Sequence, residues 1–152
     1  MAKPPDVLFV CVHNAGRSQM AEAFFNQIAA ARKLKLRAAS AGTMPGDHVH
    51  TEVVAVMLES GIDLSGARPR LLSDELAEGV KHVITMGCQV DAEACPALFM
   101  RGVKDWGLPD PKGKPLGGVR IVRDEVRRRV ESLINEMAQH HPGDRQSPTT
   151  RI

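Results

Sequence analysis

The sequence predicts an α/β protein in which a parallel sheet carries helices on both faces. Two patterns predict this class, because apolar stretches of strand length alternate along the chain with longer segments of helical periodicity. The first stretch, Val7–Val10, is apolar throughout, which is typical of a strand buried on both faces of its sheet. The 152 residues contain no repeat and no interdomain linker. We therefore expect residues 1–139 to form a single α/β domain and residues 140–152 to form a disordered tail.

The first half of the chain is expected to supply two strands and two helices. A helix should begin at about Arg17, where apolar residues start to recur at spacings of three and four. A second strand is expected around residues 34–40. The next expected helix covers residues 51–60, with Thr51 as its cap and Gly61 as its end.

The second half is expected to add two strands and at least two helices. Residues 73–75 have the capping pattern of a short helix, whereas residues 91–98 have only weak helical character. Strands are expected over His82–Met86 and Val103–Trp106, and an amphipathic helix is expected from Arg120. The carboxyl ends of parallel strands form one edge of an open sheet, and α/β proteins bind their ligands at that edge.

Composition excludes several classes of function. The net charge of +2, the absence of tyrosine and the single tryptophan give no reason to expect nucleic-acid binding. No apolar run reaches 18 residues, so no membrane span is expected. The N-terminus lacks the features of a signal peptide, and we expect a cytoplasmic monomer. His48 and His50 have no third ligand nearby in the sequence, so no metal site is expected.

The strongest functional signal is an eight-residue polar loop between the first strand and the first helix. Its residues are Cys11, Val12, His13, Asn14, Ala15, Gly16, Arg17 and Ser18. The backbone amides of residues 12–17 can curl around a tetrahedral oxyanion, and the helix that begins at Arg17 adds the positive end of its dipole. Arg17 can donate two hydrogen bonds to the same oxyanion, and Ser18 can donate one to the Cys11 sulfur.

The same loop predicts a reactive thiol at Cys11. Helix N-termini and neighbouring cations lower the pKa of a cysteine from about 8.5 to roughly 3.5–7.5. We therefore expect Cys11 to be a nucleophilic thiolate. The alternative is a small buried hydrophobic cysteine, but that role needs neither a glycine-containing polar loop nor an arginine beside it.

The chain has two further cysteines, Cys88 and Cys95, seven residues apart. In a reducing compartment a disulfide is expected to be transient and catalytic rather than structural. On a helix this spacing places the two residues on one face with Cα atoms about 10.5 Å apart. A disulfide tolerates no more than about 7 Å, so a helical segment would have to unwind before they could join. A loop would carry no such cost, and two inert thiols remain the alternative.

Several of these motifs carry a family resemblance. Cys-x5-Arg-Ser after a Val-Leu-Phe-Val strand resembles the low-molecular-weight tyrosine phosphatase superfamily. The string Asn14–Glu22 resembles the arsenate reductase branch of that superfamily. So do the strings Ser40–Gly42, Gly61–Asp63, Trp106–Pro111 and Val122–Glu125. The resemblance covers about residues 6–137 and implies a four-stranded parallel sheet in the order 2-1-3-4.

The resemblance implies a thioredoxin-coupled arsenate reductase that needs no bound cofactor. Cys11 would attack arsenate, Cys88 would attack Cys11 to release arsenite, and Cys95 would attack Cys88. Thioredoxin would then reduce the Cys88–Cys95 disulfide by thiol–disulfide exchange. Asp110, which precedes Pro111, matches the general acid of the superfamily, although an Asp-Pro pair is also a common turn.

The resemblance also bears on two details of the site. Some family members bind potassium through groups that match Asn14, Glu22 and Ser40. The acidic partner usual in the following loop aligns with Arg70, whose charge repels a cation, so we expect no potassium site. His13 is expected to be a passive wall of the loop rather than a charged ligand.

Three other functions share parts of the pattern. A low-molecular-weight tyrosine phosphatase has the same loop and acid, but such phosphatases tend to carry tyrosines after the Asp-Pro pair and this chain has none. A reductase that uses a small thiol such as mycothiol lacks the downstream cysteine pair. A non-enzymatic oxyanion sensor would need the loop without a general acid or thiol pair.

Overall fold

The computed structural model describes residues 4–87 and 103–139, and its strands form one parallel sheet. The strands lie in the order β2-β1-β3-β4, with every adjacent pair parallel. They are β1 (Val7–Cys11), β2 (Ala38–Gly42), β3 (His82–Thr85) and β4 (Val103–Asp105). Both the predicted fold class and the predicted strand order are confirmed. Cys88, Cys95, the weak helix expected at 91–98 and the tail expected at 140–152 lie outside the described residues.

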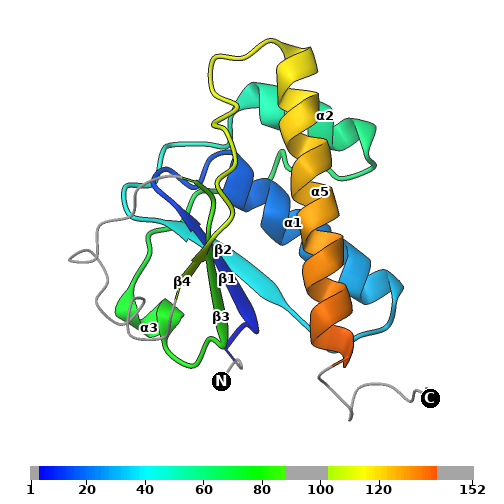
Figure 1. Cartoon of the computed structure of the whole chain (residues 1–152). Coiled ribbons are helices and arrows are strands. Elements are labelled where there is room, and N and C mark those ends of the chain that lie inside the picture. Colours follow the sequence, from blue (N-terminus) through cyan, green and yellow to red (C-terminus); the bar gives the residue numbers. More distant parts are fainter. Residues whose placement is uncertain (1–3, 88–102, 140–152) are drawn as a thin grey trace.

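The helices of the described ranges lie on both faces of this sheet. The helices are α1 (Arg17–Ala31), α2 (Thr51–Glu59), α3 (Asp74–Ala77) and α5 (Leu116–Gln139). The long helices α1 and α5 lie together against one face, with α2 beside the first half of α5, and the short helix α3 lies on the other side of the sheet (Figure 1). Strand β1 lies between β2 and β3, and the short loop that follows its carboxyl end leads into α1.

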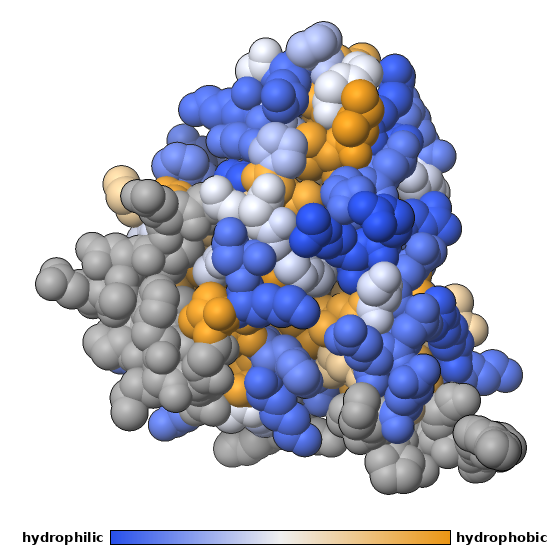
Figure 2. All heavy atoms as spheres, in the orientation of Figure 1, coloured by the Kyte–Doolittle hydropathy of each residue, from blue (hydrophilic) through white to orange (hydrophobic). Residues whose placement is uncertain are grey.

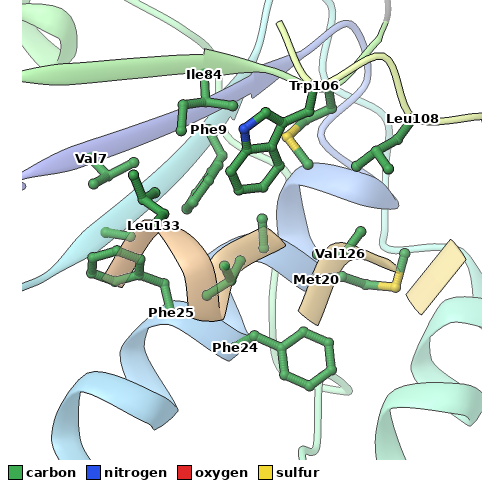
Figure 3. Close-up of a cluster of buried hydrophobic side chains, with 14 of the residues drawn as sticks. Val7, Phe9, Met20, Phe24, Phe25, Ile84, Trp106, Leu108, Val126 and Leu133 are labelled. Atoms are coloured by element: carbon green, nitrogen blue, oxygen red, sulfur yellow. The ribbon is translucent and has the colours of Figure 1, made fainter. Parts of the chain in front are cut away.

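The main core lies between the sheet and the two long helices. Figure 3 shows Phe9 of β1 pointing toward these helices beside Trp106, and the two ring centroids are 5.5 Å apart. Phe25 of α1 meets the other side of Phe9 in an edge contact at 6.2 Å. On the opposite face, Leu8 and Val10 pack in a second buried cluster with residues of and around α3. Burial of both sides of β1 explains why its sequence is apolar at every position.

Two boundaries predicted from the sequence were wrong. The second strand begins at Ala38 rather than at residue 34, because Lys33 adopts a positive φ of 58° and Leu34 still donates to Ala29 O at 2.9 Å. Residues 34–37 therefore connect α1 to β2. The last helix begins at Leu116 rather than at Arg120.

Of the helix ends predicted from the sequence, the cap of α2 was wrong, whereas the end of α2 and the cap of α3 are confirmed. Thr51 is the first residue of α2 rather than its cap, and the cap position belongs to His50, whose carbonyl accepts from Val53 N and Val54 N. Gly61 does end that helix, with a φ of 82° that favours glycine. Ser73 caps α3, because its hydroxyl accepts from Leu76 N at 3.1 Å.

Hydrophilic side chains predominate on the face of the molecule shown in Figure 2, with hydrophobic residues exposed in small patches between them. Among the residues that the structure describes, the large hydrophobic residues with exposed side chains are Met44, Leu58, Leu71, Leu116 and Ile121. Among residues 4–87 and 103–139, no helix has the length and apolar character needed to cross a bilayer.

Candidate active site

The loop predicted to bind an oxyanion lines a cavity of about 180 Å³ at the carboxyl edge of the sheet. Its walls are Cys11, Val12, His13, Ala15, Gly16, Arg17, His50 and Asp110. The nucleophile, the arginine and the general acid predicted from the sequence are thus brought together in one cavity. Asn14 and Ser18 lie behind this wall, fully buried.

Hydrogen bonds hold the loop by its carbonyl groups. Val12 O accepts from Met44 N at 2.8 Å, His13 O from Gly46 N at 3.0 Å, and Ala15 O from His50 N at 2.9 Å. Within the described ranges we find no acceptor for the amides of residues 13–16. The segment that precedes α2 therefore fastens one side of the loop and leaves a row of amide donors available to an oxyanion.

Asn14 fixes the shape of this loop from inside. It takes a left-handed conformation with a φ of 52°, which asparagine tolerates better than most residues. Its Oδ1 accepts from Arg70 N at 2.8 Å and from Gln19 Nε2 at 3.1 Å. Its Nδ2 donates to the hydroxyls of Ser18 at 2.7 Å and Ser40 at 2.9 Å. Two donors on one side and two hydroxyl oxygens on the other determine the orientation of the amide.

The same contacts determine where the Ser18 proton points. The Ser18 Oγ lies 3.0 Å from Cys11 Sγ and already accepts a hydrogen bond from Asn14. Its own hydrogen is then free to point at the sulfur, where it stabilises a thiolate more than a neutral thiol. Cys11 itself is 4% exposed, so little solvent competes for this contact.

Behind Asn14 the network ends at the half-buried carboxyl group of Glu22. Ser40 donates through its hydroxyl to Glu22 Oε1 at 2.5 Å. Burial raises the pKa of Glu22 above its ordinary value, while the Ser40 hydrogen bond and the Arg70 charge act in the opposite direction. The resemblance associates three groups with potassium in some family members, Asn14, Glu22 and Ser40. In this chain Ser40 bridges the other two by one hydrogen bond to each.

Arg17 connects three segments of the site. Its Nη1 donates to Met86 O at 2.8 Å and to Leu108 O at 2.7 Å, and its Nη2 lies 3.7 Å from Asp110 Oδ2. The residue is only 7% exposed. Because Nη1 is engaged with the two carbonyls, Nε and Nη2 are the donors that remain for an oxyanion.

The two aspartates of the β4 region have different surroundings. Asp110 lines the cavity with a side chain that is 56% exposed, and its Oδ1 accepts from Lys112 N at 3.0 Å in the turn beyond it. Asp105 does not line this cavity; its Oδ1 accepts instead from Thr85 Oγ1 and from Gly87 N. Both aspartates are exposed, but of the two only Asp110 lies in the cavity, where a proton donor to a bound oxyanion is required.

His50 is a wall residue that sequence reasoning missed. In the sequence, His50 was considered only as a metal ligand, a role that the lack of a third ligand argues against. The fold brings it close to Gly16, because a Cβ built on Gly16 would lie 3.6 Å from His50 Cδ2. His13 also lines the cavity, with its Nδ1 3.0 Å from Met44 O. In the part of the chain that the structure describes, no three His, Cys, Asp or Glu side chains converge in a way that could hold a metal.

Two proteins with known names match most of this chain in sequence. A Halobacterium salinarum protein, named as a candidate arsenate reductase, is 44% identical over 133 residues, which is 84% of this chain and 89% of that protein. The glutaredoxin arsenate reductase of Synechocystis is 37% identical over 134 residues, covering 87% of this chain and 98% of that protein.

Solved structures with the same fold carry two kinds of activity in their names. The thioredoxin-dependent arsenate reductase of Corynebacterium glutamicum is 31% identical, with a TM-score of 0.73 over 92% of this chain and 65% of that one. The YwlE arginine phosphatase is 25% identical, with a TM-score of 0.81 over 90% of this chain and 97% of that one. The family model described as low molecular weight phosphotyrosine protein phosphatase matches residues 6–142. On that match, and on the loop, arginine and aspartate gathered in one cavity, the chain belongs to the low molecular weight phosphotyrosine protein phosphatase family.

Proposed function

We propose that this protein is an arsenate reductase that works through Cys11, Cys88 and Cys95 and is regenerated by thioredoxin. The observation that carries the proposal is the hydrogen bond from Arg17 to Met86 O at 2.8 Å. It ties the chain that leaves β3 to the guanidinium of the oxyanion loop, two residues before Cys88. Met86 N also donates to Val10 O at 3.2 Å, so the described segment that leads to Cys88 lies beside the end of the strand that carries Cys11.

In the first step, the Cys11 thiolate attacks the arsenic atom of bound arsenate. The loop amides and the remaining donors of Arg17 bind the other oxygens and the negative charge that develops on them. A sulfur–arsenic bond forms and one arsenic–oxygen bond breaks. Asp110 supplies the proton with which that oxygen leaves as water, and arsenic remains in its pentavalent state.

The second step moves two electrons. The Cys88 thiolate attacks Cys11 Sγ, forming a Cys11–Cys88 disulfide, and the electron pair of the sulfur–arsenic bond passes to arsenic. Arsenic(V) becomes arsenic(III) and leaves as arsenite, while the two sulfurs are oxidised. Cys95 then attacks Cys88, which frees Cys11 as a thiolate and leaves a Cys88–Cys95 disulfide.

The reductant we propose is thioredoxin, acting in the cytoplasm on a monomeric reductase. A dithiol partner reduces the Cys88–Cys95 disulfide by attack on one of its sulfurs, and no resident cofactor is required. The name of the Corynebacterium relative supports this choice, whereas the Synechocystis relative is named for glutaredoxin. A pair of cysteines that carries the oxidation away from the substrate site favours a protein dithiol over a small thiol.

A phosphatase is the second candidate function, and the backbone favours it. The TM-score to the arginine phosphatase, 0.81, exceeds the 0.73 to the Corynebacterium reductase, although sequence identity ranks the two in the opposite order. The loop suits any tetrahedral oxyanion. Backbone similarity therefore reflects the step that reductases and phosphatases have in common, which is attack of the cysteine on the bound oxyanion. What happens to the Cys11 adduct after that step depends on particular side chains. The proposed reductase mechanism uses Cys88 and Cys95, whereas phosphate hydrolysis requires neither.

An assay of arsenite formation separates these functions. The protein, arsenate and NADPH are combined either with thioredoxin and thioredoxin reductase or with glutaredoxin, glutathione and glutathione reductase. We expect NADPH consumption coupled to arsenite only with the thioredoxin pair, and its loss in the Cys88→Ser and Cys95→Ser variants. Repeated turnover to arsenite in either variant, or hydrolysis of aryl phosphate by the parent protein without any arsenite, would overturn the proposal.

A further inference from the structure

One carboxylate outside the substrate cavity binds the chain just before Cys88. Asp105, the last residue of β4, accepts with a single oxygen from Thr85 Oγ1 at 2.6 Å and from Gly87 N at 2.8 Å. The backbone beside it is paired as well, because Trp106 N donates to Thr85 O at 2.9 Å. Asp105 thus cross-links the end of β4 to the end of β3 and to the first residues beyond β3.

The backbone at Gly87 is closely confined. Its φ of 92° favours glycine, and a Cβ at this position would lie 2.5 Å from Leu108 O and 2.6 Å from Leu108 N. The preceding residue is held on two further sides, since Met86 N donates to Val10 O at 3.2 Å and Met86 O accepts from Arg17. Both of these anchors of Met86 belong to the sheet or to the substrate loop, whereas the amide of Gly87 depends on Asp105.

We infer that Asp105 is a positioning residue for the thiol-exchange step, because it fixes the backbone from which the chain continues to Cys88. The inference rests on the proposed relay. Attack of one thiolate on another sulfur requires close and directed approach, and loss of an anchor one residue away lowers the effective concentration of the attacking group. Asp105 does not line the cavity, so we expect the first step and oxyanion binding to be independent of it.

Three variants separate this role from a general structural one. Asp105→Ala removes both hydrogen bonds. Asp105→Asn keeps an acceptor oxygen for Thr85 and Gly87, and Thr85→Val removes one donor but leaves the Gly87 contact. Each is combined with Cys95→Ser, so that Cys11 and Cys88 are the only remaining thiols.

The readout does not require arsenate. One equivalent of dithiobis(nitrobenzoate) converts Cys11 to a mixed disulfide and releases one thionitrobenzoate. Cys88 thiolate then attacks Cys11 Sγ, the mixed disulfide breaks, and a second thionitrobenzoate leaves as Cys11–Cys88 forms. The rate of this second release measures the exchange step. Hydrogen exchange at the Gly87 amide and the Kd for inorganic phosphate are measured on the same variants.

We expect Asp105→Ala to slow the second release at least about tenfold, the scale of a lost hydrogen bond to a charged group, and to accelerate exchange at Gly87. Phosphate affinity should stay within about threefold, because Asp105 does not line the cavity. Asp105→Asn and Thr85→Val should both remain within about threefold of the parent rate.

An unchanged rate of the second release in Asp105→Ala overturns the inference. A parallel loss of phosphate affinity also overturns it, because it would mean that the whole site had collapsed. Failure of the unsubstituted protein to form arsenite would refute the proposed function without affecting this result.

Discussion

The Ser18 hydroxyl lies 3.0 Å from the sulfur of Cys11 and is oriented by a hydrogen bond that it accepts from Asn14. In the proposed mechanism this contact stabilises the thiolate of Cys11. Ser18→Ala should therefore move the pH of half-maximal alkylation of Cys11 by iodoacetamide upward by about one unit, the effect of one hydrogen bond to a charged group. Alkylation is followed by mass spectrometry in Cys88→Ser/Cys95→Ser protein. A midpoint that does not move would remove Ser18 from this role.

Asp110 is expected to act in the first step and not in binding. Asp110→Asn removes the transferable proton but keeps an oxygen for Lys112 N, so the turn should persist. Arsenate turnover should fall about a hundredfold or more, in the range typical of general acid catalysis. The Kd for phosphate should stay about the same, because the loop and Arg17 bind the oxyanion and the amide has the same size as the carboxyl group it replaces. Turnover equal to that of the parent protein would show that the proton comes from elsewhere.

His50 is expected to contribute to oxyanion binding. Its side chain lines the cavity and its backbone amide is tied to Ala15 O, so the imidazole is held beside the loop. His50→Ala should weaken phosphate binding by about threefold to tenfold, as expected for one lost polar contact. His48→Ala is the matched control, because His48 is exposed and lies outside the cavity wall. Equal effects of the two substitutions, measured by titration calorimetry, would contradict a specific role for His50.

Glu22 should make the stability of the fold depend on pH in the opposite sense from most carboxylates. Burial raises its pKa in the folded protein above the ordinary value of 4.5, so the folded state binds this proton more tightly than the unfolded chain. Its contribution is favourable below pH 4.5 and is lost as the pH rises through the folded pKa. Glu22→Gln should therefore gain stability relative to the parent as the pH is raised from about 4 to about 8, measured by urea unfolding. A difference in the free energy of unfolding that stays constant over this range would contradict the raised pKa.

Much of the site could be predicted because its signals are local in sequence. The strand at Val7, the loop after it and the helix from Arg17 are contiguous, and their apolar pattern, glycine and arginine each indicate the same structure. The boundary errors have local physical causes. The second strand was placed too early because Lys33 and Leu34 still complete the end of α1. The cap of α2 was placed one residue late because His50, rather than Thr51, holds its first turn.

The rest of the site depends on contacts between distant segments. His50 reaches the cavity because its amide bonds to Ala15, a pairing across 35 residues that no spacing rule encodes. The separate roles of Asp105 and Asp110 also arise from tertiary contacts, since both are aspartates in one short stretch of sequence. Arg17 is held by the backbone carbonyls of Met86 and Leu108. Every residue has such a carbonyl, so the sequence does not indicate which ones bind the arginine.

Mass spectrometry of the Cys95→Ser variant after a single turnover with arsenate tests the relay most directly. With the third cysteine absent, the relay predicts one equivalent of arsenite and a disulfide-linked peptide pair joining Cys11 to Cys88. Stoichiometric arsenite without that linked pair, or no arsenite from a protein that still hydrolyses aryl phosphates, would contradict it.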